Sequence, residues 1–222
     1  NSIVVSTGAS AKWLGLESEQ RLRGKGVSAC ATCDGAFFRD QHVIIVGGGD
    51  TAMEEATFLT KFASKVTVLH RREELRASKA LQKRAFNDDD IEFMWNTELE
   101  EVLGDDVVDG VVVINNETGE KTTLDDVQGV FIAIGHKPNT DLFKGVVDMD
   151  DVGYIQVEHP STKTKVPGLF ACGDAIDAVY RQAVTAAGTG CKAALDAERY
   201  LGTLEVSDSE ETEEGELAEA EE

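Results

Sequence analysis

The sequence predicts an α/β fold built around a parallel β-sheet. Residues 43–46 form a short apolar, β-branched run, as in a buried parallel strand, and residues 66–69 predict a second buried strand. Between them lie a glycine cluster and then apolar residues at helical spacing, namely Ala52, Ala56, Leu59 and Ala63. This order of strand, glycine turn, helix and strand within about 30 residues is a βαβ unit.

After the βαβ unit, the pattern predicts one helix and then a group of strands. Residues 75–86 have the spacing of a helix. Residues 91–95, 107–114 and 121–124 have the composition of strands. The segment "NNETGE" between the last two is a turn signal, so we expect these two strands to be connected directly.

Three further strands and a helix complete the predicted elements. Residues 130–134 form an apolar run that stops at "GHKPN", and residues 153–157 precede a proline-containing loop. The stretch "GLFACGD" predicts a strand that ends in a glycine. The last regular element is a helix that begins at Tyr180 or Ala183 and ends at Tyr200, and the chain has no internal repeat.

Composition limits the class of protein. The chain has 222 residues, 41% of them apolar, which is enough for one large domain or two small ones. No run approaches about 18 consecutive apolar residues, so no membrane span is predicted. The net charge is −21, which argues against non-specific nucleic-acid binding because such binding needs clustered Lys and Arg. Residues 205–222 carry ten acidic and no basic residues, and we predict that this acidic tail is disordered.

The cysteines indicate the compartment. Cys30, Cys33, Cys172 and Cys191 are not spaced like the disulfide framework of a small secreted domain, so we predict a cytoplasmic protein. The chain begins at Asn1 in an apolar, strand-like run without an initiator Met. We expect that processing, or the choice of boundary, has removed what came before.

The glycine cluster predicts a dinucleotide site. "GGGDTA" fits the pattern G-x-G-x-x-A with Gly47, Gly49 and Ala52. The first glycine makes the tight turn, the second lets the backbone approach a pyrophosphate, and the third small residue lets helix and strand pack closely. The phosphates would then face free N–H groups at the positive end of the helix.

The residues after the second strand predict which dinucleotide binds. An NAD site usually has an acidic residue there for the ribose 2′-hydroxyl, but this chain has "HRR", which is His70, Arg71 and Arg72, followed by Arg76. Guanidinium groups bind a 2′-phosphate through charge-assisted hydrogen bonds, so the sequence favours NADPH over NADH. The alternative is a solvated basic patch paired with Glu73 and Glu74.

Cys30 and Cys33 have the C-x-x-C spacing of a redox disulfide, and Asp34 directly after them could act as general acid and base. A metal site would need two more ligands, and none is predicted because Cys172 and Cys191 do not form a second pair at that spacing. The other alternative is that Cys30 and Cys33 are a plain pair of buried residues. For Cys172 and Cys191, we predict that they are small core residues. Hydride from nicotinamide reduces a disulfide poorly, so the chemistry also calls for a flavin.

Several motifs together resemble one family. "SACATCDG", "GGGDTAMEEA", "HRREELRA", "IAIGHKPNT", "GLFACGDAID" and "YRQAVTAAGTGCKAALDAERYL" are similar, in this order, to the low-molecular-weight, bacterial-type thioredoxin reductases. The resemblance covers residues 3–202. It implies a Rossmann-like NADPH domain at 11–128, inserted into a partial FAD domain of the flavoprotein disulfide reductase type at 1–10 and 129–204, with the acidic tail at 205–222.

The resemblance also implies roles for residues. Cys33 would face the flavin, Cys30 would attack the disulfide of thioredoxin, and Asp34 would manage the proton. The residues that would hold NADPH are Gly47, Gly49, Asp50, Thr51, Ala52, His70, Arg71, Arg72 and Arg76. The residues that would lie at the FAD are Thr7, Gly8, Gly173, Asp174, Arg181, Gln182 and Ala183. Lys25 and Phe37 match positions near docked thioredoxin, whereas Ala36 departs from the aromatic residue common there.

One part of the family pattern is absent. The family begins with its own G-x-G-x-x-G strand–turn–helix for the ADP half of FAD, a part on the order of 100 residues. We therefore expect this chain to be a fragment that binds NADPH but holds FAD poorly and turns over slowly. The family also implies a homodimer. Our own hypothesis is that the glycine-bearing connections near Gly8 and Gly129 act as hinges for a domain rotation.

Two other functions fit part of the pattern. The flavoprotein subunit of an alkyl hydroperoxide reductase shares the C-x-x-C-D-G and the glycine loop, but it is commonly linked to NADH, so "HRR" argues against it. A non-enzymatic nucleotide-binding or interaction module is the alternative of another class.

Overall fold

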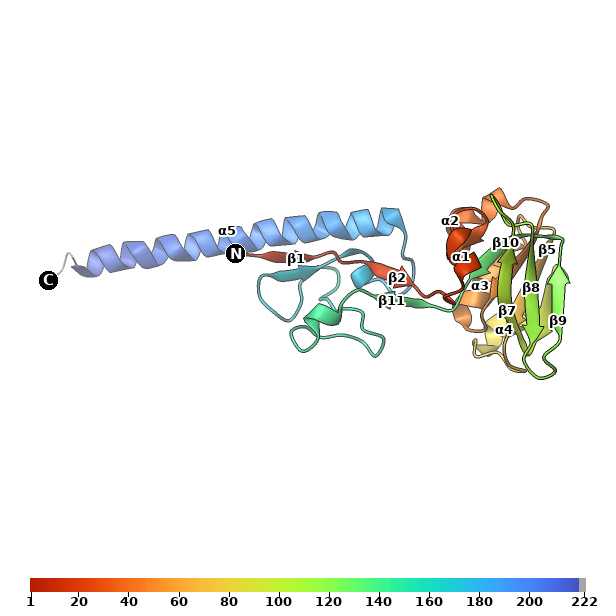
Figure 1. Ribbon diagram of the computed structural model, residues 1–222. Helices are drawn as coiled ribbons and strands as arrows, with labels where there is room; N and C mark the ends of the chain where they lie inside the picture. The colour runs from red at the N-terminus through yellow and green to blue at the C-terminus, as the bar shows by residue number, and fades with distance from the viewer. Residues whose placement is uncertain (220–222) are drawn as a thin grey trace. The chain divides into compact units, whose positions relative to one another are not determined.

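The computed structural model describes the backbone of residues 1–219 and the side chains of residues 1–204. The chain forms two compact units, unit 1 (Asn1–Ser10 and His136–Glu222) and unit 2 (Ala11–Gly135) (Figure 1). Unit 2 begins at the residue where we expected the inserted domain to begin, but it ends at residue 135 instead of 128. The reason is that strand β10 (Val127–Ile132) pairs with strand β4 (His42–Val46) inside the sheet of unit 2.

Unit 2 contains a five-stranded parallel sheet with the strand order β3-β10-β4-β5-β6. The other three strands are β3 (Val27–Ser28), β5 (Lys65–His70) and β6 (Ile91–Trp95). β4 and β5 are joined by helix α3 (Asp50–Leu59), which confirms the predicted βαβ unit. All four neighbouring pairs are parallel, so the carboxyl ends of the five strands lie at one edge of the sheet.

Helices cover one face of this sheet and a second sheet covers the other. α3 and helix α4 (Lys79–Phe86) pack on Val43, Ile45 and other residues of one face. The antiparallel sheet of β7 (Thr97–Leu103), β8 (Gly110–Asn115) and β9 (Lys121–Leu124) packs on Ile44, Val46 and their neighbours on the opposite face. Side chains along β4 alternate between the two cores, which explains why this strand is buried at every position and apolar from Val43 to Val46.

Several element boundaries differ from the prediction. α4 begins at Lys79, not at residue 75, because the N–H groups of Arg76 and Ala77 donate to the carbonyl of Gly48 (2.7 and 3.1 Å) and hold this segment as a loop. β8 begins three residues later than expected, and β10 begins three and ends two residues earlier. β7 was not predicted, since its three glutamates hide the alternation that buries Leu99 and Val102.

Unit 1 is built around two short parallel strands, β1 (Ile3–Val5) and β12 (Leu169–Ala171). Helix α5 (Ala183–Glu219) packs on Phe170 and Cys172 through Ala193 and Ala197. A second pair of strands, β2 (Ala9–Ala11) and β11 (His136–Pro138), lies where the chain passes between the units.

The predicted strand at 153–157 is absent. Only Ile155 forms a bridge, with Met149, and the N–H of Ile155 donates to the carbonyl of Ala175 instead of to a neighbouring strand. The backbone of this segment is therefore satisfied by contacts with loops.

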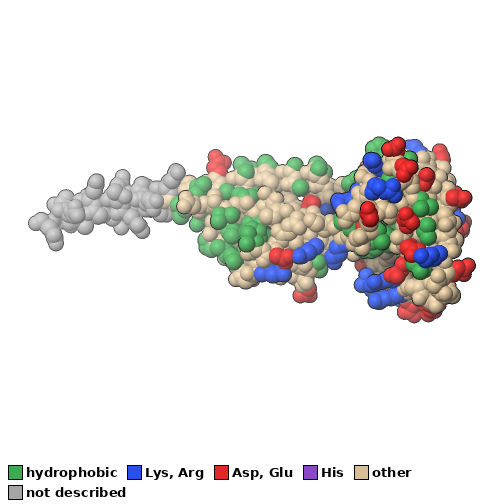
Figure 2. All heavy atoms as spheres, viewed as in Figure 1, with side chains coloured by type: hydrophobic (Ala, Val, Ile, Leu, Met, Phe, Trp, Pro, Cys, Tyr) green, Lys and Arg blue, Asp and Glu red, His purple; other side chains and the backbone are tan. Residues whose placement is uncertain are grey.

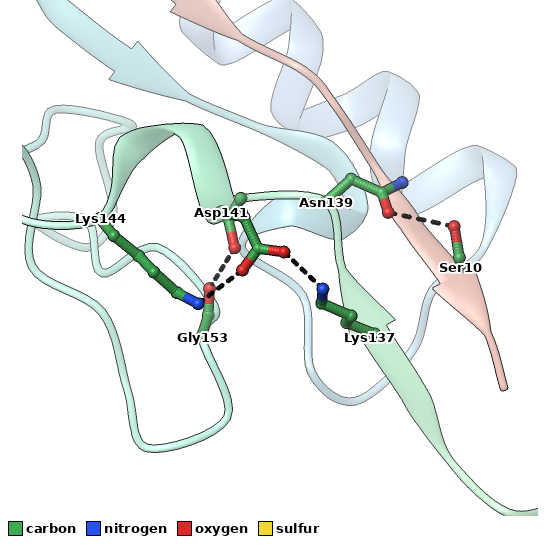
Figure 3. A network of polar contacts seen from close by, with 7 residues as sticks. Ser10, Lys137, Asn139, Asp141, Lys144 and Gly153 are labelled. Carbon is green, nitrogen blue, oxygen red and sulfur yellow. Dashed lines mark hydrogen bonds and ion pairs between the residues drawn. The ribbon is translucent and has the colours of Figure 1, made fainter.

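A polar network organises the segment that follows β11 (Figure 3). Asp141, in the short 3₁₀ helix η2 (Asp141–Phe143), forms ion pairs with Lys137 and with Lys144. The hydrogen bond from Lys137, followed by that from Lys144, lowers the pKa of Asp141 from 3.8 to about 2. The Thr140 hydroxyl donates to the carbonyl of Gly153 at 2.6 Å, which joins this segment to the following loop.

The end of the chain differs from the expected disordered tail. The backbone of α5 continues as a helix through Glu219, while residues 220–222 lie outside the described part. Glu, Leu and Ala have high helix propensity, and an existing helix is extended without a new nucleation step. Among the helices that the structure describes, none has both the length and the apolar content needed to cross a bilayer.

The surface of unit 2 mixes acidic and basic side chains. Figure 2 shows them interspersed over the visible face of this unit, without a large single-sign patch there.

Gly129, near which we expected one of the two hinge connections, lies within β10. Gly135, with φ +99°, is the glycine at the boundary between the two units.

Candidate redox and dinucleotide site

Three predicted motifs follow three strands of the same parallel sheet. Cys30 comes two residues after β3, Gly47 follows β4 directly, and His70 ends β5. Because the strands are parallel, these three positions lie along one edge of the sheet. Ligands of open α/β sheets bind at this edge.

The C-x-x-C motif forms a disulfide. The Sγ atoms of Cys30 and Cys33 are 2.05 Å apart. Cys30 is the N-cap of the four-residue helix α2 (Ala31–Asp34), and its sulfur accepts a hydrogen bond from the N–H of Cys33 at 3.2 Å. Cys33 is exposed and Cys30 is half-buried, so the bond can be reached from solvent.

Asp34 lies beside this disulfide in the chain and is half-buried. Its Oδ2 accepts a hydrogen bond of 2.6 Å from the hydroxyl of Ser28, the last residue of β3. Ser28 and Asp34 line a cavity of about 430 Å³ together with Lys25 and Phe37. Phe37 is 78% exposed, so it offers an apolar surface next to the redox centre.

The glycine loop has the close packing that its pattern predicts. A Cβ on Gly47 would lie 2.4 Å from the carbonyl oxygen of Ala133 and 2.9 Å from the Cβ of Ala52. Gly49 is the N-cap of α3, and a Cβ there would meet nothing within 4 Å. The space over Gly49 and the free N–H groups of the first turn of α3 therefore fit a pyrophosphate.

Asp50 and His70 support the loop that carries the arginines. The Asp50 carboxylate accepts a hydrogen bond from the N–H of Ser78 at 2.7 Å. His70 is buried, its Nε2 is 2.9 Å from the carbonyl oxygen of Glu74, and its ring packs on the backbone of Gly48. Both residues thus hold the segment 71–78 against the glycine loop.

The three arginines of this segment are exposed. None of Arg71, Arg72 and Arg76 forms an ion pair with Glu73 or Glu74 in the described part of the chain. The alternative of a self-paired basic patch therefore has no support in the geometry. Guanidinium groups left available at this position fit a 2′-phosphate.

A cavity of about 550 Å³ joins these features. Gly47, His70, Arg71 and Arg76 line it among the predicted residues, whereas Gly49, Asp50, Thr51, Ala52 and Arg72 are not part of its wall. Its opposite wall, which was not predicted, comes from the start of unit 2 and from β7 and includes Leu14, Leu16 and Glu98.

Glu19 holds part of that unpredicted wall in place. It lies in helix α1 (Glu17–Arg21) and is fully buried. Its two carboxylate oxygens accept the N–H groups of Leu14 and Gly15, each at 2.9 Å. No periodicity distinguishes Glu19 from the exposed Glu17 two residues before it, so the sequence did not reveal this role.

Unit 1 contains the residues predicted to lie at a flavin. The carbonyls of Thr7 and Gly8 accept hydrogen bonds from the side chain and the backbone N–H of Asn139 (3.1 and 2.9 Å). The N–H of Gly173 donates to the Thr189 hydroxyl at 2.9 Å. These contacts join the end of β1 to the β11 segment, and the short 3₁₀ helix η3 (Gly173–Ala175) to α5.

Asp174 is half-buried and accepts no hydrogen bond within the described residues. Burial, and next the charge of Asp177, raise the pKa of Asp174, while Arg181 opposes them. A half-buried carboxylate without a donor fits the hydroxyl groups of a ribityl chain, so this part of the flavin assignment is compatible with the chain.

The loop before α5 depends on Asp177, which was not singled out from the sequence. Its carboxylate accepts the N–H groups of Val179, Tyr180 and Arg181 at 2.8–2.9 Å. Arg181 has φ +49°, and its guanidinium contacts the Tyr154 hydroxyl at 3.4 Å. The Thr185 hydroxyl accepts the N–H of Gln182 at 3.3 Å, just before α5 begins at Ala183.

We expect Asp177 to make the stability of unit 1 depend on pH. Burial acts to raise the pKa of Asp177, but the hydrogen bonds from Tyr180, Arg181 and Val179 outweigh it and lower this pKa below 3.8. Its stabilisation is therefore complete above the ordinary pKa of about 4 and is lost as the pH falls through the lowered value.

Thermal melts of the wild type and Asp177→Asn from pH 2 to 7 measure this effect. The variant should be less stable at neutral pH, and the difference should shrink below about pH 4. A difference that stays constant down to pH 2 would contradict the assignment.

The other two cysteines differ from each other. Cys172 is a buried residue, as predicted, and burial raises its pKa. Cys191 is exposed on α5, so the prediction that it is a core residue is wrong. Ala193 faces the core, and Cys191 lies two residues before it in the same helix. Residues two apart in a helix point to different sides, so Cys191 points away from the core.

Comparison with known proteins agrees with this geometry. The sequence model of the family described as "Pyridine nucleotide-disulphide oxidoreductase" matches residues 1–190. A thioredoxin reductase from Streptomyces clavuligerus is 56% identical over 210 residues, which are 95% of this chain and 64% of that protein. A bifunctional thioredoxin reductase/thioredoxin from Mycobacterium leprae is 51% identical, over 95% of this chain and 46% of that protein.

A solved structure is also similar. Thioredoxin reductase from Giardia duodenalis superposes with a TM-score of 0.86 and 45% sequence identity, over 90% of this chain and 66% of that one. The chain thus spans less than two thirds of the length of these relatives.

Proposed function

The chain belongs to the pyridine nucleotide-disulphide oxidoreductase family, and on this premise we propose that it is the NADPH-binding and redox-disulfide part of a flavoprotein that reduces thioredoxin. One observation carries the proposal. The Cys30–Cys33 disulfide and the glycine loop of the dinucleotide cavity lie at the same edge of one parallel sheet. The high identity to proteins named thioredoxin reductase supports thioredoxin as the partner.

The cofactors proposed are NADPH and FAD. NADPH would be held by the glycine loop and the first turn of α3, with Arg71, Arg72 and Arg76 toward the 2′-phosphate. The flavin would contact Thr7, Gly8, Gly173 and Asp174, and the residues Arg181, Gln182 and Ala183 at the start of α5. When bound, NADPH would supply a hydride, and FAD would convert it into electrons that reduce a disulfide.

The chain's own chemistry is thiol–disulfide exchange. Two electrons delivered through the cofactors, together with one proton taken up from solvent, would break the Cys30–Cys33 bond and leave the Cys33 thiolate and the Cys30 thiol. The sulfur of Cys30, after losing its proton to Asp34, attacks the thioredoxin disulfide and forms a mixed disulfide. Cys33 then attacks Cys30, which restores the disulfide and releases thioredoxin with both sulfurs reduced. Asp34 returns the proton to the leaving thiolate.

The available arginines favour this reading over the flavoprotein subunit of an alkyl hydroperoxide reductase, since that enzyme is commonly linked to NADH. The accessible disulfide argues against a non-enzymatic nucleotide-binding module, because such a module has no use for it. A homodimer and a cytoplasmic location belong to the same proposal.

Reassembly tests the proposal. The chain is co-expressed with the N-terminal third of the Streptomyces clavuligerus relative, and FAD content and NADPH-dependent thioredoxin reduction are measured. We expect both with the reassembled protein, and little of either with the chain alone. Reduction with NADH of a peroxiredoxin instead of thioredoxin would favour the peroxide-linked reductase. Tight NADPH binding in an FAD-loaded assembly that reduces neither protein would favour the binding module.

A further inference from the structure

Ser28 connects the redox disulfide to the carboxylate beside it. We propose that Ser28 is a positioning residue, whose hydroxyl holds the Asp34 carboxylate and the backbone of Cys30 in one arrangement and so accelerates thiol–disulfide exchange. The inference deepens the proposed function and rests on it. It assigns a role to a residue outside the C-x-x-C-D motif itself.

The contacts of the Ser28 hydroxyl define this arrangement. It donates to Oδ2 of Asp34 at 2.6 Å and accepts the N–H of Cys30 at 3.1 Å. The carbonyl of Cys30 is a second possible acceptor, at 3.5 Å. A hydroxyl has one proton, and the short distance to the carboxylate is typical of a charge-assisted hydrogen bond, so the proton is directed to Asp34.

The Asp34 carboxylate depends on Ser28 for its orientation. Within the described residues, the Ser28 hydroxyl is the one hydrogen-bond donor to the Asp34 carboxylate. Asp34 is the last residue of α2, which has only four residues and is a weak support. Ser28, in contrast, is 7% exposed and pairs with Phe131 in the parallel sheet. The sheet therefore orients the carboxylate through Ser28.

The chemistry of exchange explains why this orientation matters. When the Cys30 sulfur attacks a disulfide, its S–H proton passes to the Asp34 carboxylate, and the new S–S bond forms as the old one breaks. The leaving thiolate then takes the proton. Proton transfer needs the carboxylate within hydrogen-bond reach of the sulfur, and a displacement of about 1 Å can cost a factor of 100. Without Ser28, the carboxylate and the Cys30 backbone lose their common anchor.

The test measures exchange without any cofactor. The chain carries Cys191→Ser, because exposed Cys191 would also react. It is reduced with a phosphine, which is then removed, and the release of thionitrobenzoate from 5,5′-dithiobis(2-nitrobenzoate) is followed by stopped flow at pH 7. We expect Ser28→Ala to lower the second-order rate constant about tenfold or more. Ser28→Thr, which restores the hydroxyl, should recover most of the rate.

Ser18→Ala is the matched control. Ser18 is also a buried serine of unit 2, 9% exposed, and its hydroxyl accepts the N–H of Val102 at 3.0 Å. The Ser18→Ala variant should lose about as much stability as Ser28→Ala does, and it should keep the wild-type exchange rate. An equal loss of rate in Ser18→Ala would overturn the inference, as would a wild-type rate in Ser28→Ala.

A double variant keeps the test valid even if Ser28→Thr folds poorly. In Asp34→Asn, the carboxylate is gone, so adding Ser28→Ala should slow exchange little further. If the double variant instead lost as much rate as the product of the two single losses, Ser28 would not act through Asp34. The proposed function is tested separately. If the reassembled protein does not reduce thioredoxin, the proposed function is wrong, even when the exchange rates of these variants are as expected.

Discussion

The double variant Arg71→Ala, Arg72→Ala is expected to lose the proposed preference for NADPH over NADH. Both side chains are exposed at the end of β5, and neither is tied up in an ion pair with Glu73 or Glu74. A hydrogen bond to a charged group contributes about 1.5–3 kcal/mol. Loss of two such bonds should raise the Kd for NADPH about 100-fold or more, because 1.4 kcal/mol is a factor of ten. The Kd for NADH should change little.

Calorimetric titration of the wild type and the double variant with both nucleotides measures the Kd for NADPH and the Kd for NADH. Arg84→Ala is the control, since Arg84 is an exposed arginine in the last turn of α4 and does not line the cavity. Its affinity for both nucleotides should equal that of the wild type. Equal binding of NADPH and NADH by the wild type would make "HRR" an ordinary surface patch, and it would favour the peroxide-linked reductase.

Gly47→Ala and Gly49→Ala are expected to separate folding from cofactor binding. The new Cβ at Gly47 would be 2.4 Å from a backbone oxygen, which cannot move without displacing the strand end. Such overpacking costs about 1–3 kcal/mol, and sometimes more. At Gly49 the Cβ meets nothing, and alanine at this N-cap should cost about 1 kcal/mol at most. Both variants should bind NADPH much more weakly, because the pyrophosphate needs close approach to the loop.

Urea unfolding followed by tryptophan fluorescence reports on the relevant unit, since both tryptophans, Trp13 and Trp95, lie in unit 2. The midpoint should fall clearly for Gly47→Ala and little for Gly49→Ala. If Gly49→Ala bound NADPH as tightly as the wild type does, the phosphate would not lie at the start of α3. If Gly47→Ala were fully stable, the close contact with Ala133 would not limit this turn.

Local patterns predicted much of unit 2. The apolar, β-branched runs within β4 and β5 are visible because both faces of these strands are buried. β7 was missed because it exposes glutamates on one side and buries Leu99 and Val102 on the other, with a shift of register between Leu99 and Glu101 that interrupts the alternation. Residues 153–157 have strand composition, but in the described part of the chain their pairing is limited to the single bridge between Ile155 and Met149.

The features of the candidate site also divide into those that the sequence determined and those that only the tertiary structure decided. The sequence alone determined the βαβ unit, the C-x-x-C pair and the arginines after β5, because each depends on residues close together in the chain. Only the tertiary structure decided that β3, β4 and β5 bring these motifs to one edge, and that buried Glu19 supports a wall of the cavity. It also decided that Ser28 holds Asp34. The physical reason is that hydrogen bonds and packing between separate elements depend on the position of both partners, which no local pattern records.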